Sequence, residues 1–136
     1  MIRYFLIFSL GVVVHLFARD VFYYNNGKKI DLSPVDTQNI SKRSDARIPS
    51  ATEYYKTPND TLIGVSNQLI IKFKNLDSFK EIVNTYKLTL LKEIYKNTYL
   101  FKVDALSDTL DISNQIYKLK SVKFAHPNFI RKAKER

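Results

Sequence analysis

The clearest alternation of hydrophobic and polar positions lies between residues 62 and 130. Leu69, Ile71 and Phe73 alternate with Lys72 and Lys74, a period of two that predicts a strand with one buried face. Pro127 lacks a backbone N–H and should end the last strand. Further strands are expected over 88–95, where Leu88, Leu90 and Ile94 are in phase, over 99–103 and over 122–125.

Two helices are predicted between these strands. Ser78 and Glu81 have capping-box spacing at the start of the first helix, which contains apolar residues at helical intervals. Asp108 is expected to cap the second helix, whose apolar stripe follows the spacing i, i+4, i+7 at Ile112, Ile116 and Leu119. The resulting order βαββαβ predicts an α+β class and a ferredoxin-like antiparallel sheet with two helices on one face.

Three segments are expected before this domain, which is assigned to 62–130. A mostly apolar N-terminal run of fourteen residues, Tyr4–Phe17, is too short to span a membrane and predicts a signal peptide over 1–18. Residues 19–33 should form a β-hairpin about Asn25-Asn26-Gly27. Residues 34–61, rich in polar residues and proline, are expected to be a linker, with a dibasic pair Lys42-Arg43 and sequons at Asn39 and Asn59.

Composition narrows the chemistry that the chain can carry. There is no cysteine, and His15 and His126 are the two histidines, so we expect neither a metal site nor a cofactor. The net charge of +9 would attract anionic partners. The lysines of the chain are scattered singly along the sequence, which is also typical of a solvated sheet surface. Aromatic residues at 95, 99 and 101 favour cross-strand packing over base stacking, because the segment has no RNP motif and the leader implies export.

The residues of the predicted domain also resemble a known family. The strand Asn67–Lys74, the following helix and the closing run Val122-Lys-Phe-Ala-His-Pro-Asn-Phe129 are similar to the fervidolysin-type N-terminal prodomain of secreted subtilisin-like proteases. The resemblance implies an intramolecular chaperone and inhibitor whose open sheet face packs on a subtilase catalytic domain. It also implies that the segment after the last strand enters the substrate cleft of the protease. In this chain that segment is Pro127, Asn128, Phe129, Ile130, Arg131 and Lys132, and residues 131–136 form a basic tail.

The chain carries none of the subtilase triad motifs, and His126 has no Gly-Thr context, so we expect no enzymatic activity. The expected product is a monomeric exported protein, periplasmic, envelope-bound or secreted, that binds no nucleic acid. Two interpretations stay open within the family: a free-standing inhibitor or chaperone, and the remnant of a protease precursor. An alternative is an envelope binding module of ferredoxin-like fold that recognises anionic lipid or a polyanion through its basic surface.

Overall fold

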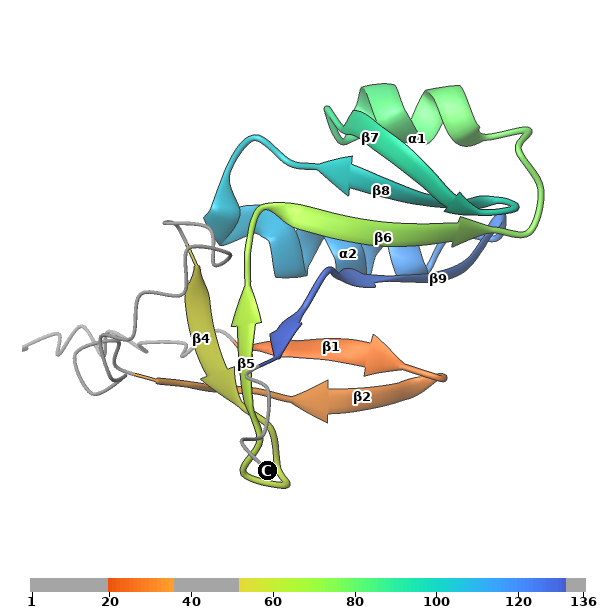
Figure 1. Ribbon diagram of the computed structural model, residues 1–136. Helices are drawn as coiled ribbons and strands as arrows, with labels where there is room; N and C mark the ends of the chain where they lie inside the picture. Colours follow the sequence, from red (N-terminus) through yellow and green to blue (C-terminus); the bar gives the residue numbers. More distant parts are fainter. Residues whose placement is uncertain (1–19, 36–51, 132–136) are drawn as a thin grey trace, which may run out of the picture.

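The computed structural model describes residues 20–35 and 52–131. Figure 1 shows a sheet with the helices packed on it, and below it a second sheet beside a hairpin. The strands are β1 (Phe22–Asn25), β2 (Lys28–Asp31), β3 (Ser33–Pro34), β4 (Glu53–Lys56), β5 (Leu62–Val65), β6 (Gln68–Phe73), β7 (Thr89–Tyr95), β8 (Thr98–Lys102), β9 (Val122–Pro127) and β10 (Ile130–Arg131). The helices are α1 (Phe79–Thr85), a 3₁₀ helix (Leu106–Asp108) and α2 (Thr109–Tyr117). The predicted α+β class is confirmed.

The large sheet has the strand order β7-β8-β6-β9, and all neighbouring strands are antiparallel. The alternation predicted for β6 is confirmed, because Leu69, Ile71 and Phe73 are at most 1% exposed. These three side chains share one buried cluster with Ile82 of α1 and Ile116 of α2, so both helices cover the same face of the sheet. The opposite face is the one turned toward the viewer in Figure 1, where α2 lies behind β6 and β9.

Aromatic side chains fill the space beneath α1. The ring of Phe79 lies 5.0 Å from Tyr99 and 5.2 Å from Phe73, measured between centroids. Phe101 belongs to the same buried cluster. The predicted packing role of Tyr99 and Phe101 is therefore confirmed, whereas Tyr95 is 75% exposed.

Two local predictions differ from the structure. Ser78 and Asp108 occupy the N-cap positions of α1 and α2, but neither side chain makes a capping hydrogen bond. In β7, register shifts between Leu90 and Lys92 and between Glu93 and Tyr95 break the simple period of two. Leu90, expected to be buried in phase with Leu88, pairs with the buried Phe101 but is 47% exposed, because β7 is an edge strand of the sheet. Bulges of this kind redirect side chains, and a binary pattern does not reveal them.

The N-terminal hairpin forms as predicted, and its turn has positive φ angles at Asn26 (49°) and Gly27 (80°). It is docked: Asn114 of α2 donates a hydrogen bond from Nδ2 to the carbonyl oxygen of Phe22 at 2.9 Å. The ring of Tyr24 stacks on Tyr117 with centroids 4.5 Å apart. The hairpin is therefore attached to the large domain through α2.

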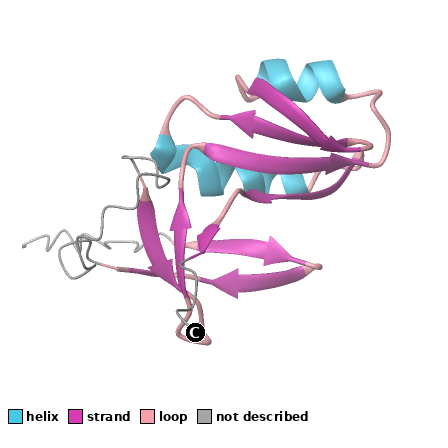
Figure 2. Cartoon of the chain, in the orientation of Figure 1, coloured by secondary structure: helices cyan, strands magenta, loops and turns pink. Residues whose placement is uncertain are grey.

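A second four-stranded sheet has the order β10-β5-β4-β3. Its strand β4 falls within 34–61, the range expected to be linker, so at least residues 53–56 of that range are ordered sheet. A second buried cluster joins this sheet to the hairpin and contains Tyr23, Leu32, Tyr55, Ile63 and Val65. Figure 2 shows the large sheet above the hairpin and the second sheet, with both helices on the far side of the large sheet. The expected signal peptide, the dibasic pair and the Asn39 sequon lie outside the described residues.

Candidate functional site: an exit segment and an open sheet face

The residues predicted to enter a protease cleft are held by the protein's own sheets. Pro127 is the last residue of β9, pairs with Leu69 and is fully buried. The backbone N–H of Asn128 donates to the carbonyl oxygen of Gln68 at 2.9 Å, and the Asn128 side-chain amide donates to Oε1 of Gln68 at 3.2 Å. Ile130 and Arg131 form β10, while Lys132 lies outside the described residues. The segment Asn128–Arg131 is called the exit segment below.

A row of stacked rings accompanies the exit segment. Phe124 lies 5.3 Å from His126, and His126 lies 6.1 Å from Phe129, with interplanar angles of 15° and 6°. Phe129 also contacts the ring of Tyr23 edge-on at 4.6 Å. Nδ1 of His126 lies 2.8 Å from the carbonyl oxygen of Pro127, so the Nδ1-protonated tautomer donates this hydrogen bond. His126 thus has a packing and hydrogen-bonding role at the edge of the sheet.

The open face of the large sheet has an apolar centre. The register places Ile70 opposite Leu100 on one side and His126 on the other, and Ile70 lies between the buried Leu69 and Ile71 in β6. Leu100 is only 9% exposed, so Ile70 and His126 are the more accessible of the three. Since cross-strand partners share a face, they point away from the helices. Phe124, paired with Lys72, extends the apolar area along β9.

The charged residues that the described register places on this open face all have the same sign. Lys72 pairs with Thr98, Lys102 with Gln68, and Lys92 with Leu100. Glu93 pairs with Tyr99, whose ring lies in the core, so its carboxylate belongs to the helix side. An apolar centre with cations around it matches the anatomy of protein interfaces, which have an apolar core and a polar rim.

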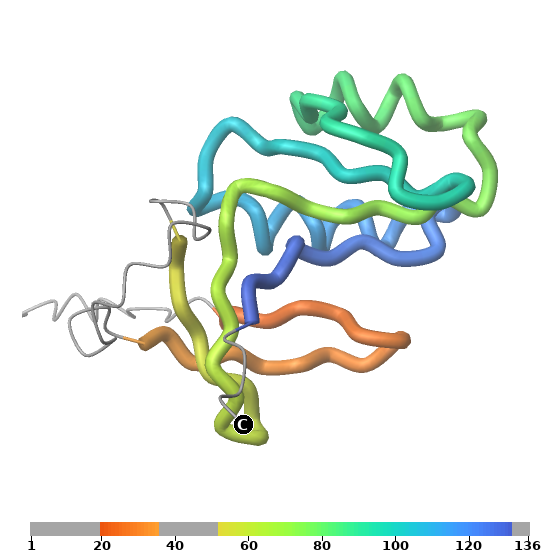
Figure 3. Tube along the Cα trace, in the orientation of Figure 1, coloured from red at the N-terminus to blue at the C-terminus, as the bar shows by residue number. Residues whose placement is uncertain are grey.

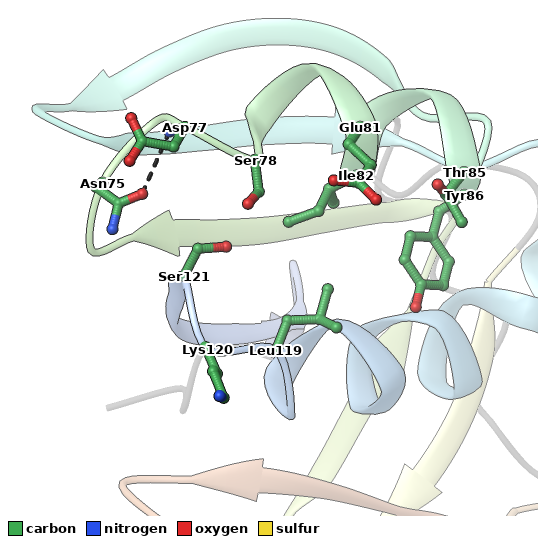
Figure 4. Close-up of a pocket in the computed structure, with 10 residues that line it drawn as sticks. All are labelled: Asn75, Asp77, Ser78, Glu81, Ile82, Thr85, Tyr86, Leu119, Lys120 and Ser121. Carbon is green, nitrogen blue, oxygen red and sulfur yellow. Dashed lines mark hydrogen bonds between the residues drawn. The ribbon is translucent and has the colours of Figure 1, made fainter.

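A pocket on the helix side lies between α1 and the chain that follows α2. Figure 4 shows its walls, with Glu81 and Ile82 of α1 facing Leu119 and Ser121. Near one end, the backbone N–H of Asp77 donates to Oδ1 of Asn75 at 3.2 Å. The described residues contain no group of three or more potential metal ligands. This pocket faces away from both the open face and the exit segment.

Comparison with known families now decides what kind of domain this is. Residues 51–128, more than half of the chain, match the fervidolysin N-terminal prodomain family. The chain belongs to this family. The matched range runs from just before β4 to Asn128, so it includes the large sheet, both helices and part of the second sheet. The predicted resemblance is confirmed, and the matched domain of the family is non-catalytic.

The hairpin and the end of the exit segment lie outside the matched range. No curated protein and no solved structure matches the chain with significant similarity. Within residues 20–35 and 52–131, no helix has the length and apolar character needed to cross a membrane.

The sequence interpretation missed the second sheet and with it the anchoring of the exit segment. A signal was present in Glu53-Tyr-Tyr-Lys56, because adjacent tyrosines favour strands, but the surrounding prolines favoured a linker. The contact between Tyr23 and Phe129 joins residues more than one hundred positions apart. Local patterns carry no information about such a contact.

Proposed function

We propose that this protein is an exported, non-catalytic prodomain-like binder that inhibits a subtilisin-like serine protease or assists its folding. The family match carries the proposal, since subtilase prodomains associate with their catalytic domains in the precursor. Subtilases of this kind are secreted, which supports export. The strand order β7-β8-β6-β9, with two helices on one face, supports a ferredoxin-like arrangement for this domain.

In this proposal the open face is the main contact with the catalytic domain. Ile70 and Phe124 supply the accessible apolar area, the buried Leu100 lies beside Ile70, and Lys72 and Lys102 lie around them. The exit segment leaves the same sheet through β9 and leads the chain, by way of residues 127–132, toward the substrate cleft. Extended backbone beyond the sheet can pair with a strand edge of the enzyme, which is a general way for proteases to hold peptides.

Inhibition and refolding assays test the proposal directly. Subtilisin-like catalytic domains from the source genome, produced without their own prodomains, would be titrated with the purified protein while peptide hydrolysis is followed. We expect inhibition, or a higher yield of active enzyme after refolding. Failure to inhibit or refold any of these proteases at micromolar protein would refute the function.

A variant pair locates the contact. Ile70→Asp places a carboxylate at the centre of the open face, whereas Lys80→Asp makes a charge change on exposed α1 at the helix side. Residues at the centre of an interface typically contribute about 2 kcal/mol or more, so Ile70→Asp should weaken inhibition roughly 30-fold. Lys80→Asp should leave it unchanged, and circular dichroism would verify that both variants are folded. Equal effects of the two variants would contradict the open-face assignment.

A second candidate function rests on the charge of the same face. Lys72, Lys92 and Lys102 could attract anionic lipid or a polyanion, at about 1 kcal/mol for each lysine near an acidic membrane surface. Vesicles with and without phosphatidylserine separate the two candidates. Salt-sensitive vesicle binding without any protease inhibition would favour this alternative.

A further inference from the structure

The exit segment is docked on the protein along its whole length. Asn128 is tied to Gln68 by two hydrogen bonds, one from its backbone and one from its side chain. Two residues later the chain joins the second sheet, where Ile130 pairs with Gly64 and Arg131 with Ile63 in antiparallel register. The segment therefore crosses from the large sheet to the small one, and Figure 3 shows the blue trace passing from β9 to the yellow-green β5.

Phe129, between these two attachments, packs into the second buried cluster. Its ring lies 4.6 Å from Tyr23, which is 8% exposed and belongs to strand β1. Strand β1 is in turn fixed to α2 through Asn114 and Tyr117. The N-terminal hairpin, which lies outside the range matched to the family, thus supports the end of the domain from which the chain departs.

Gly64 makes room for strand β10. A Cβ atom at this position would lie 2.8 Å from Cγ2 of Thr52 and 3.3 Å from Cβ of Ile130. Real Cβ atoms essentially never approach another heavy atom as closely as the first of these distances. Any larger residue at position 64 would therefore have to displace the side chain of Thr52, just before β4, and would crowd Ile130 of β10. The absence of a side chain at Gly64 thus leaves room beside β5 for Thr52 and Ile130.

From these contacts we infer that the exit segment is a docked spacer, and that Phe129, Tyr23 and Gly64 are residues that position it. This inference rests on the proposed function and deepens it. The part of the chain that enters a protease cleft then begins after Arg131, and Asn128–Arg131 keeps its own sheet pairing in the complex. If the exit segment entered the cleft itself, β10 would have to unpair and Phe129 would lose its cluster.

Such docking has a physical advantage for a protein that contacts the protease both with its open face and with a chain in the cleft. A flexible connection between the open face and the cleft would lose its conformational freedom on binding, and that loss would weaken the complex. A connection already ordered by the hairpin and β5 has little freedom left to lose. The spacer also sets the distance between the two contacts.

Hydrogen exchange on the purified protein tests the docking without any protease. We expect the hydrogen-bonded amides of residues 128–131, that of Asn128 among them, to be protected, and Phe129→Ala to raise their exchange about tenfold or more, which corresponds to about 1.4 kcal/mol. Phe129→Tyr keeps the ring and should restore protection. Tyr86→Ala, a matched aromatic truncation in the main cluster, should leave these amides protected. Unprotected hydrogen-bonded amides in residues 128–131 of the unaltered protein would overturn the inference.

Gly64→Val gives a second, independent perturbation, because it acts through β5 rather than through the ring of Phe129. It should release residues 130–131 while α1 and β6 to β8 stay protected. Unchanged exchange at residues 130–131 in folded Gly64→Val would also count against the docking.

Inhibition measurements then separate this inference from the proposed function. Once a subtilase that the unaltered protein inhibits has been identified, Phe129→Ala should weaken its inhibition about tenfold or more while the amides of α1 and β6 stay protected. Phe129→Tyr should restore inhibition, and Tyr86→Ala should not affect it. Protected amides with no inhibition of any protease would refute the proposed function alone. Inhibition unaffected by Phe129→Ala, despite lost protection, would refute the spacer role alone.

Discussion

The stacked pair of Tyr24 and Tyr117 determines how firmly the N-terminal hairpin is held on α2. The two rings are nearly parallel, with an interplanar angle of 9° and centroids 4.5 Å apart. Aromatic pairs of this kind contribute about 0.5–1.5 kcal/mol beyond the area that they bury. The neighbouring hydrogen bond from Asn114 to the Phe22 carbonyl adds a net contribution of about 1 kcal/mol. These two contacts with α2, which add to the burial of Tyr23 in the second cluster, have energies that can be measured one by one.

A double-mutant cycle on Tyr24→Ala and Tyr117→Ala isolates the ring contact. Each single variant should lower the free energy of unfolding by less than the roughly 3 kcal/mol typical of fully buried aromatic residues, because both side chains are only partly buried. The coupling between the two substitutions should be about 1 kcal/mol. Urea denaturation followed by circular dichroism gives these values, provided that the m value is unchanged across the set.

A control cycle pairs Tyr24→Ala with Tyr95→Ala. Tyr95 is 75% exposed on β7, a strand at the other edge of the large sheet from the hairpin, so the two substitutions should be additive within about 0.5 kcal/mol. Phenylalanine at positions 24 and 117 keeps both rings and should preserve stability. A coupling between Tyr24 and Tyr117 no larger than that of the control pair would refute the docking argument.

Two further perturbations address the two buried clusters. Ile116→Ala should lower the free energy of unfolding by about 2–5 kcal/mol, because Ile116 is fully buried between α2 and the sheet, whereas Ile116→Val should cost about 0.5–1.5 kcal/mol in the same urea titration. Burial, together with the hydrogen bond to Glu53 and its charge, raises the pKa of Tyr55 above its usual value of 10.0. The unfolded chain then loses this proton first, so stability should fall as the pH rises above about 10, by at most about 1.4 kcal/mol per pH unit. Tyr55→Phe should remove that part of the slope in denaturation measurements between pH 8 and 11.5, and an identical slope in both proteins would contradict the assignment.

Much of the large domain could be predicted because its pattern is local. Leu69, Ile71 and Phe73 reveal the buried side of β6, since side chains of a strand alternate between the two faces whatever the strand pairs with. The hairpin turn was equally predictable from Asn26 and Gly27, whose positive φ angles suit these residue types. The closing run that ends in Pro127-Asn128-Phe129 was enough to indicate the family, because its residue types and spacing are carried by the sequence alone.

The candidate site was only partly predictable. The sequence indicated which residues follow the last strand, but it described them as a tail, whereas Ile130 and Arg131 pair with β5. It indicated the exposed face for Lys72 but not for Lys92, because the bulges in β7 alter the phase that a simple alternation assumes. Register between strands decides both properties, and register depends on pairing partners that lie far away in the chain.

The sequence by itself determined the elements of the large domain, its α+β class, its family and the place where its last strand stops. Only the tertiary structure decided that the hairpin docks on α2, that Glu53–Lys56 joins a second sheet, and that Phe129 packs against Tyr23. The physical reason is the range of the interactions. Periodicity, capping positions and turn residues express forces between neighbours in the chain, whereas the second cluster forms from segments that are brought together only when the whole chain has folded.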